Sequence, residues 1–542
     1  MVRKNLNYDC KSVSEINFET LKNILHDNAN TEYGIEHNFS KIKTIEDYRK
    51  YVPLSEYRDF EKYINRMYDG EQNILTTYPI EVFVFTSGTV NKPKLIPLTK
   101  KALDVYSNNF KRDKNDLVRL NREKNPKASR LFVTIFRTDL SKPHDRNMLF
   151  SEIIYRHLYD NGCMNMSEYV GGKELLFDEQ TLDMFYMKLW SAILDENIVL
   201  IESVYMYDLF QFFSFFEKNY KKVISDIREK VIPDSVKLSD QVRKKLLELP
   251  VSADRLDFVE QECSKGFEGI VPRIWPKTQL VSGISSSTFK YENKGLDRYL
   301  GDVHKDFLEF AMSESQVGVT VKFDSFEYEF VANSAFYEFI PCNENGEYCG
   351  QVVSMDKLET GKSYELVLTN LSGLYRYKTG DVLKILNNSN EQVIFEFMFR
   401  KNLVLNLAGE KISAKNIEVV MEKMDKVVPG ILEYTFGATI IDNVGRYFVF
   451  LCLKNNSIDL SNDELSEILD SILSEVNCLY KELRHLNFIV KPVVYVNNEE
   501  EYSLLMNKKS IERKHNKPVN ILCATKLNKI LERYDNNEKN FV

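Results

Sequence analysis

Three short segments of the sequence combine residue types that could bind a nucleotide. The first is Thr86, Ser87, Gly88 and Thr89, directly after the apolar run 82–85. Closely spaced hydroxyls and a glycine at the end of a strand let backbone N–H groups and hydroxyls converge on phosphate oxygens, and Lys92 or Lys94 can add positive charge. The segment lacks the G-x-x-x-x-G-K-[ST] pattern, so it is not a standard P-loop. It predicts a triphosphate-binding loop, with an ordinary turn as the alternative.

The second segment places a carboxylate at the end of an apolar run. Glu314 lies between two serines, immediately after the run 307–312. A carboxylate in that position suits Mg²⁺, which takes few protein ligands, keeps several waters and bridges nucleotide phosphates. The alternative is a solvated glutamate in a loop. Glu314 is therefore the predicted metal ligand.

The third segment, residues 373–385, reads GLYRYKTGDVLKI. Here Gly380 is expected to turn the chain, and Asp381 to end the turn before another β-rich run. An aspartate at such a place can accept two hydrogen bonds from the vicinal hydroxyls of a ribose. A plain Gly-Asp turn accounts for the pattern almost equally well.

The elements that must position these segments alternate along most of the chain. From residue 80, β-rich runs such as EVFVF, NIVLIESV and YELVLTNL alternate with helical stretches. This rhythm predicts an α/β body with parallel or mixed sheets and covering helices, preceded by polar-faced helices in residues 14–70. A stripe of Leu209, Phe212, Phe213 and Phe216 could form a wall for an acyl group, but packing against the core is favoured.

A small α+β domain is expected after about residue 402. Two strand runs, YTFGATII and RYFVFLCL, flank the turn DNVG and predict a hairpin. Ser461 and Glu464 form a capping box at the start of a helix. The apolar face of that helix is predicted from seven residues: Leu465, Ile468, Leu469, Ile472, Leu473, Val476 and Leu479.

Composition narrows the function classes. The chain has 542 residues and a net charge of -8, which argues against a surface that binds nucleic acid. Its eight cysteines contain no C-x-x-C pair, so reduced thiols in a cytoplasmic protein are expected. No stretch approaches the roughly 18 apolar residues of a membrane span.

The order of the three segments resembles the acyl-adenylate-forming superfamily, and most closely its Gretchen Hagen family of acyl-acid amido synthetases, as a bacterial-type member. The family's Tyr-Ala-Ser-Ser-Glu is matched by FAMSE at 310–314, and GLYRYKTGDVL is similar to its third region. The segment FEFMFRKNLVLNLAGEKIS is similar to its hinge strand. The resemblance implies a large adenylation domain over 1–401 and a small mobile domain over 402–542.

The resemblance also implies roles for individual residues. Phe310 stands where the family has tyrosine and would offer an aromatic face to adenine. Asp381 would hold the ribose, with Arg400 as a weaker candidate. The family's C-terminal lysine motif is only loosely matched, so Lys514 and Lys517 remain joint candidates for the adenylation lysine. The full set of implied nucleotide-binding residues is Thr86, Ser87, Gly88, Thr89, Phe310, Met312, Ser313, Asp381 and Arg400.

By this resemblance the protein would use ATP and Mg²⁺ to adenylate a carboxylic acid and would then transfer the acyl group to an amino acid or other amine. A monomer is favoured. Two alternatives stay open: delivery of the acyl group to a thiol of coenzyme A or a carrier protein, and a decayed synthetase that only binds nucleotide.

Overall fold

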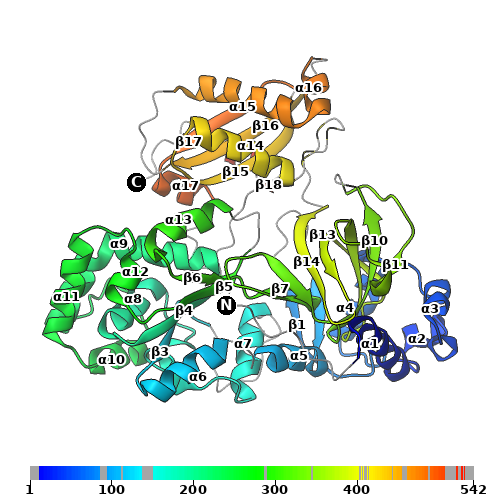
Figure 1. The fold of residues 1–542 in the computed structure, drawn as a ribbon, viewed down its shortest axis with the longest axis horizontal. Coiled ribbons are helices and arrows are strands. Elements are labelled where there is room, and N and C mark those ends of the chain that lie inside the picture. The colour runs from blue at the N-terminus through cyan, green and yellow to red at the C-terminus, as the bar shows by residue number, and fades with distance from the viewer. Residues whose placement is uncertain are drawn as a thin grey trace.

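A computed structural model describes most of the chain, and Figure 1 shows its arrangement. The described residues are 11–85, 94–110, 114–136, 150–285, 290–343, 346–401, 405, 407, 410, 412, 414–441, 444–453, 460–485, 489–506, 521–522, 527–528 and 530–531. Within them the elements form a parallel sheet with its helices, an antiparallel sheet flanked by the N-terminal helices, and a smaller C-terminal sheet. This is the expected mixed α/β fold with a large N-terminal and a small C-terminal domain.

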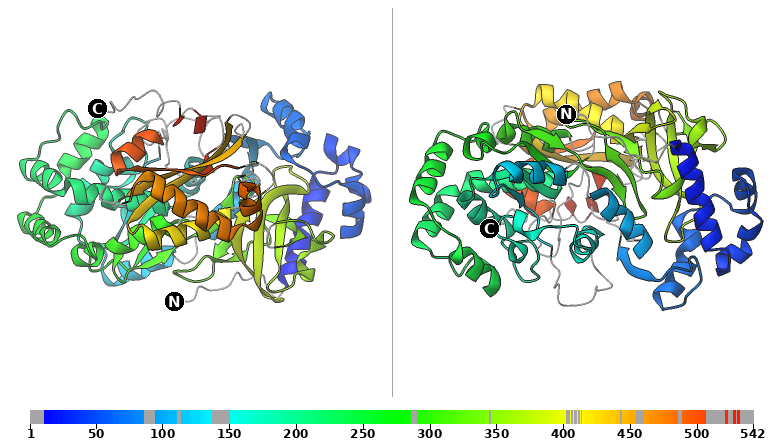
Figure 2. Two further views of the ribbon diagram at one scale, coloured as in Figure 1. Left: turned by 90° about the horizontal axis from the view of Figure 1, so that it is seen from above. Right: turned by 60° about the horizontal axis from the view of Figure 1, so that its bottom comes forward.

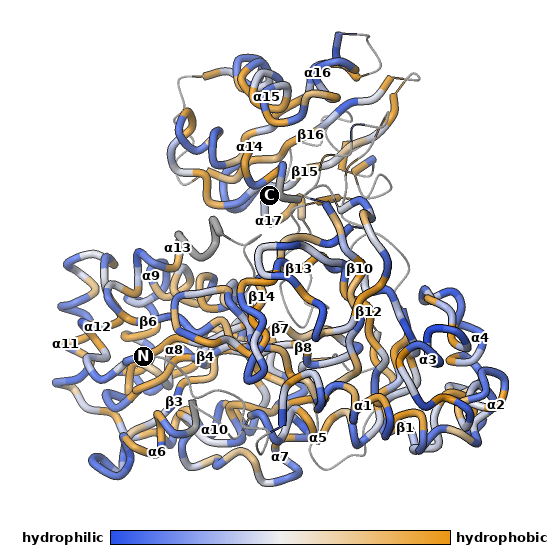
Figure 3. Tube along the Cα trace, turned by 45° about the vertical axis from the view of Figure 1, so that its right-hand side comes forward, coloured by the Kyte–Doolittle hydropathy of each residue, from blue (hydrophilic) through white to orange (hydrophobic). Residues whose placement is uncertain are grey.

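The N-terminal helices precede a two-stranded hairpin. They are α1 (Val13–Asp27), α2 (Glu32–Glu36), the 3₁₀ helix η1 (Phe39–Lys41), α3 (Ile45–Tyr51) and α4 (Tyr57–Tyr68). The hairpin pairs β1 (Ile80–Phe85) with β2 (Leu95–Thr99) and leads into α5 (Lys100–Phe110), α6 (Lys114–Lys124) and α7 (Phe150–Asp160). Figure 3 shows hydrophilic residues along much of α3 and α4, as expected of helices at the periphery.

The parallel sheet has the order β3-β4-β5-β6 among the described residues. Its strands are β3 (Ser129–Phe132), β4 (Ile198–Tyr205), β5 (Leu280–Ile284) and β6 (His304–Asp306). The segments between them contribute η2 (Met166–Glu168), η3 (Lys173–Leu175), α8 (Met184–Leu194), α9 (Met206–Glu229), α10 (Asp240–Glu248), α11 (Ala253–Ser264), α12 (Ile270–Ile274) and α13 (Lys290–Leu300). Leu209, Phe212, Phe213 and Phe216 are fully buried in the core under α9. The prediction that this stripe packs against the core is confirmed.

The antiparallel sheet carries the second and third sequence segments. Its eight described strands have the order β11-β10-β12-β13-β14-β9-β8-β7. They are β7 (Glu309–Met312), β8 (Ser315–Thr320), β9 (Glu327–Phe330), β10 (Ala335–Cys342), β11 (Val353–Ser354), β12 (Ser363–Asn370), β13 (Tyr377–Asn388) and β14 (Val393–Arg400), with the 3₁₀ helix η5 (Met355–Lys357) after β11.

The expected turn at Gly380 and Asp381 is wrong, because β13 continues through both residues. Gly380 has φ +79°, a backbone conformation that glycine adopts without a Cβ clash. The pairing of β12 with β13 shifts register at this point, so the strand bulges where a turn was expected. Asp381 thereby stays in the ladder, opposite Arg400 of β14.

The described elements of the C-terminal domain, α14 to β18, lie above both sheets of the large domain in Figure 1, and they lie in front when the molecule is seen from above in the left view of Figure 2. Its elements are α14 (Ala414–Val427), β15 (Ile431–Ile441), β16 (Val444–Leu453), α15 (Asn462–Val476), α16 (Cys478–His485), β17 (Val493–Asn497), α17 (Glu499–Leu505) and β18 (Ile521–Leu522). The hairpin of β15 and β16 and the Ser461–Glu464 capping box are confirmed. Leu479 was wrongly assigned to the α15 face, because α15 ends at Val476 and Leu479 is exposed on α16.

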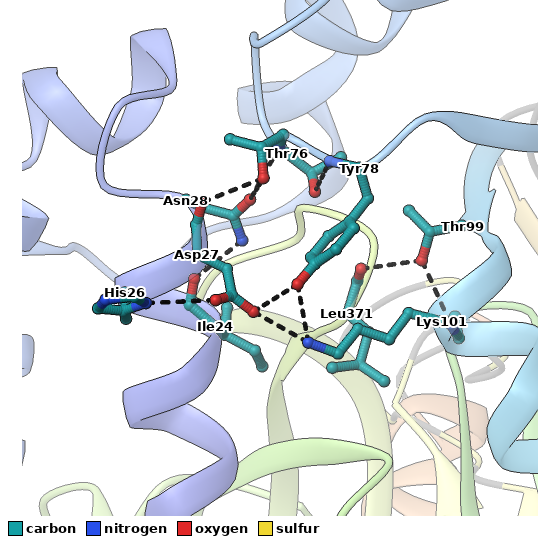
Figure 4. Close-up of polar contacts among 11 residues, drawn as sticks. Ile24, His26, Asp27, Asn28, Thr76, Tyr78, Thr99, Lys101 and Leu371 are labelled. Carbon is teal, nitrogen blue, oxygen red and sulfur yellow. Dashed lines mark hydrogen bonds and ion pairs between the residues drawn. The ribbon is translucent and has the colours of Figure 1, made fainter.

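A polar network ties the end of α1 to the start of α5 (Figure 4). Asp27 Oδ2 accepts hydrogen bonds from the Tyr78 hydroxyl at 2.5 Å and from Lys101 Nζ at 2.9 Å. Nearby, the Thr99 hydroxyl donates to the Leu371 carbonyl at 3.0 Å. The network therefore connects the N-terminal helices, the β1–β2 hairpin and the loop after β12.

A buried ion pair fixes the start of β13. Arg376 has φ +45°, and its guanidinium donates to both carboxylate oxygens of Glu338, at 2.7 and 3.2 Å, and to the Val52 carbonyl at 2.8 Å. Arg49 also donates to Glu338, at 2.8 Å. The Glu338 side chain is 1% exposed, so its charge depends on these two cations.

We predict that Asp27→Asn lowers the free energy of unfolding by about 0.5–1 kcal/mol, since Lys101 is partly exposed and its interaction with Asp27 is screened. Burial is the largest single effect on the pKa of Asp27 and raises it. The hydrogen bonds from Tyr78 and Lys101, among others, together outweigh burial, so the pKa is lowered. The stabilisation is therefore fully present above the carboxyl pKa of the unfolded chain, and it is lost as the pH falls through the lower folded pKa. Chemical denaturation at pH 7 and pH 3 measures both effects. A similar loss in the exposed control Asp302→Asn would contradict the assignment.

We predict that Arg376→Met lowers the free energy of unfolding by about 3 kcal/mol, because Glu338 is left buried with one cation instead of two. The double variant Arg376→Met, Glu338→Leu removes the buried charge and should recover part of the loss. Denaturation followed by circular dichroism tests both variants. An unchanged midpoint in Arg376→Met would show that Arg49 alone neutralises Glu338.

Candidate functional site

Glu314 occupies the turn between β7 and β8, so the prediction that it follows a strand is confirmed. The side-chain amide of Asn370 at the end of β12 donates to the Glu314 carbonyl at 2.9 Å, and this bond fixes the turn. Burial raises the pKa of the Glu314 carboxyl, while the nearby cations Arg400 and Lys94 oppose that shift. A partly buried carboxylate thus faces two positive charges.

Tyr377 links Glu314 to Lys94. Lys94 Nζ donates to the Tyr377 hydroxyl at 2.9 Å, and the Glu314 carboxylate acts electrostatically on the same hydroxyl. Burial and Glu314 both raise the pKa of the Tyr377 hydroxyl, which keeps its proton available for donation. Burial lowers the pKa of Lys94, and the Glu314 carboxylate partly offsets the shift. One hydrogen bond and the charge of Glu314 thus couple the three residues.

Asp381 and Arg400 form an ion pair across adjacent strands. Arg400 donates to the two carboxylate oxygens of Asp381 at 2.5 and 2.7 Å. The Asp381 side chain is 1% exposed, whereas that of Arg400 is 43% exposed. Asp381 raises the pKa of Arg400, which keeps the guanidinium charged. A carboxylate offers about four lone-pair sites, so Asp381 can accept further hydrogen bonds while Arg400 is bound.

Phe310, Met312 and Ser313 lie beside Glu314 with different surroundings. Phe310 is partly buried, and its ring lies 5.2 Å from that of Phe397 in a stacked arrangement. Met312 is buried in the core shared by the N-terminal helices and the antiparallel sheet. Ser313 is partly exposed in the turn. Phe310 thus belongs to an aromatic cluster, and its use for adenine stays a prediction.

Several predicted residues lie outside the described part of the chain. Thr86, Ser87, Gly88 and Thr89 stand in the sequence between the end of β1 and Lys94, and they are not among the described residues. Lys514 and Lys517 also lie outside the described residues. Of the predicted charged site residues, the described part of the chain contains Glu314, Asp381 and Arg400, and it brings these three together.

Sequence reasoning missed Tyr377 and Asn370, and it considered Lys94 only as an added charge. The contact of Tyr377 with Lys94 joins residues 283 positions apart, so no local sequence signal indicated its role. Asn370 had no such signal, because its contact with Glu314 joins strands 56 residues apart.

The donor set fits the expected magnesium ion only as a site shared with phosphates. Among the described residues there is no group of three or more His, Cys, Asp or Glu side chains that could hold a metal ion. Mg²⁺ commonly binds through one or two carboxylates together with substrate phosphates and water. A single carboxylate at Glu314 is compatible with that arrangement.

No helix in the described residues is long and apolar enough to cross a membrane.

The chain is similar to plant proteins named as amido synthetases. It is 25% identical to a jasmonoyl–L-amino acid synthetase of Nicotiana attenuata, over 88% of this chain and 84% of that protein. It is 25% identical to the indole-3-acetic acid-amido synthetase GH3.6 of Arabidopsis thaliana, over 87% of this chain and 82% of that protein. These relatives give no support to the expected bacterial type.

A solved structure has the same fold. The chain superposes on the AtGH3.15 acyl acid amido synthetase in complex with 2,4-DB with a TM-score of 0.79, at 23% identity, covering 96% of this chain and 93% of that one. The model of the GH3 family N-terminal domain matches residues 2–305, and that of the GH3 family central domain matches residues 328–400. Because these matches span most of its length, the chain belongs to the GH3 family.

Proposed function

We propose that the protein is an ATP-dependent acyl-acid amido synthetase that forms an acyl-adenylate and then an amide with an amino acid. The observation that carries this proposal is the convergence of Glu314, Lys94 and Arg400 around Tyr377 in a chain of this family. The relatives act on different acids by name, so the identity of the acid is left to experiment.

In the first step, a carboxylate oxygen of the acid attacks the α-phosphorus of ATP, and the bond to pyrophosphate breaks. Carboxylate and triphosphate repel one another, so positive charge must lie where negative charge accumulates. Lys94 and Arg400 supply that charge among the described residues, and a single such donor is typically worth about 3 kcal/mol. When bound at Glu314, Mg²⁺ would add positive charge against the phosphate oxygens.

Tyr377 and Asp381 would have supporting roles. Tyr377 accepts a hydrogen bond from Lys94 and lies near Glu314, so it would hold the ammonium close to the carboxylate. Asp381 would accept hydrogen bonds from the ribose while it remains paired with Arg400. The hydroxyl-rich loop 86–89 would bind phosphate oxygens, and Lys514 or Lys517 would enter from the C-terminal domain.

In the second step, the amine nitrogen attacks the acyl carbon, AMP leaves with the bonding electrons, and the amine gives up one proton. The C-terminal domain, for which we keep the boundary at 401 and 402, would rotate between the steps so that the lysine leaves and the amino acid site closes. Closure also excludes water from the reactive mixed anhydride.

We predict that the protein, incubated with ATP, Mg²⁺, a pool of aryl and aliphatic acids and the twenty amino acids, produces AMP and one or a few N-acyl amino acids. Glu314→Gln should reduce the product at least about a hundredfold, because it removes the carboxylate that would hold Mg²⁺ at the reacting phosphates. Mass spectrometry identifies both substrates, and Glu327→Gln on the nearby strand β9 is the matched control. AMP without amide would favour a thiol acceptor, and the absence of AMP would favour a protein that only binds nucleotide.

We predict that ATP binds more weakly as the pH rises toward the pKa of Lys94, which burial lowers below the ordinary lysine value. ATP prefers the charged ammonium, so affinity is highest at pH values below that pKa and falls as the proton is lost. Lys94→Met should remove this alkaline decline, whereas Lys378→Met, which loses a more exposed pair with Glu56, should retain it. Calorimetric titration with ATP between pH 7 and pH 10 measures the effect. An alkaline decline that persists in Lys94→Met would assign it to another group.

A further inference from the structure

Helix α9 turns one side toward the parallel sheet and another toward the C-terminal domain. Tyr207, Gln211 and Lys218 are spaced by four and seven residues, so they lie along one side of the helix. The Tyr207 hydroxyl donates to Glu433 Oε1 of β15 at 3.0 Å, and Gln211 Nε2 donates to the Tyr207 oxygen at 3.0 Å. Residues 226 positions apart are thus joined across the two domains.

Burial distinguishes this contact from a chance surface pair. Tyr207 is 4% exposed and Glu433 is 7% exposed. A second contact lies further along α9, where Lys218 Nζ is 2.5 Å from Glu499 Oε2 in the first turn of α17. Both of those side chains are largely exposed, and such pairs contribute little to stability. The buried pair of Tyr207 and Glu433 therefore contributes most of the stability of this contact. The exposed pair of Lys218 and Glu499 shows which parts of the two domains lie next to each other.

The first turn of α9 is itself held firmly. Asp208, the residue after Tyr207, accepts hydrogen bonds from Ser203 at 3.1 Å and Thr134 at 3.4 Å. All three side chains are buried at the carboxyl ends of β3 and β4. The hydrogen bonds of Asp208 thus fix the position of Tyr207 relative to the parallel sheet, and Tyr207 in turn fixes the position of Glu433.

The chemistry of the pair suits a contact that must open. A phenol and a carboxylate are both well hydrated when separated, so the net cost of breaking their hydrogen bond is moderate. Figure 1 shows β15 facing α13 as well, and the elements in contact with the C-terminal domain belong to both halves of the large domain.

We propose that Tyr207 is a positioning residue which, through Glu433, holds the C-terminal domain in the arrangement seen here. We call this pair the latch. The hydrogen bond of the latch would break when the protein changes from adenylation to amide formation. This statement about the half-reactions rests on the proposed function.

The first test does not depend on activity. In the variant Lys218→Cys, Glu499→Cys, a short bismaleimide should join the two cysteines, and the single variant Lys218→Cys should give no such product. Adding Tyr207→Phe or Glu433→Gln should slow cross-linking about threefold or more, because loss of a hydrogen bond to a carboxylate shifts the domain away. Tyr186→Phe is the matched control, since Tyr186 donates to Asp226 within the large domain at 2.8 Å.

The second test compares the two half-reactions in the protein without the Lys218→Cys and Glu499→Cys substitutions. The ratio of ATP–pyrophosphate exchange to amide formation should change about threefold or more in Tyr207→Phe and in Glu433→Gln. The double variant should change it no further, because both substitutions break the same contact. Tyr186→Phe should leave the ratio unchanged.

The outcomes separate the two proposals. An unchanged cross-linking rate in Tyr207→Phe overturns the latch, whether or not amide is formed. Slower cross-linking in a protein that makes neither AMP nor amide supports the latch and refutes the proposed function. Slower cross-linking with an unchanged ratio overturns the link between the latch and the half-reactions.

Discussion

A carboxylate shielded from water is the constraint on which the candidate site depends. Glu314 sits in the turn between two strands, where burial favours its neutral form, yet binding a cation requires its charge. The surrounding structure compensates in several ways. Lys94 and Arg400 supply opposite charge, Tyr377 holds Lys94 through a hydrogen bond, and Asn370 fixes the backbone of the turn. These residues come from strands or strand ends that are distant in the sequence, so the site exists only when the hairpin and the antiparallel sheet meet.

The same constraint accounts for the support beneath the site. Tyr377 begins β13, and the residue before it, Arg376, is held by Glu338 and by the Val52 carbonyl. Glu338 lies on β10, on the opposite side of β12 from β13. The contacts of Arg376 with Glu338 and Val52 thus fix the position of Tyr377 relative to the N-terminal helices. The strained backbone of Arg376, at φ +45°, is tolerated because these contacts determine its conformation.

The sequence predicted the parts of the structure that depend on local patterns. The phenylalanine stripe of α9, the capping box of α15 and the strand before Glu314 follow from periodicity and from residue types a few positions apart. The Gly380–Asp381 turn was wrong because the same dipeptide suits a β-bulge, and only pairing with β12 and β14 decides between them. The roles of Tyr377 and Asn370 could not be derived, because they arise from contacts between strands. Leu479 was misassigned because helical periodicity alone does not show where one helix ends and the next begins.

The pairing of Asp381 with Arg400 has a consequence for the way the two domains communicate. Arg400 is the last residue of β14, one residue before the proposed domain boundary. The next residue, Lys401, is held by the carboxylate of Glu365 at 3.0 Å and lies over the ring of Tyr348 at 3.6 Å. If the nucleotide alters the Asp381–Arg400 pair, it acts on the end of β14, directly before the segment that leads to the C-terminal domain. Thermodynamic linkage then requires reciprocity: any domain orientation that strains this strand end weakens nucleotide affinity by the same factor by which the nucleotide disfavours that orientation.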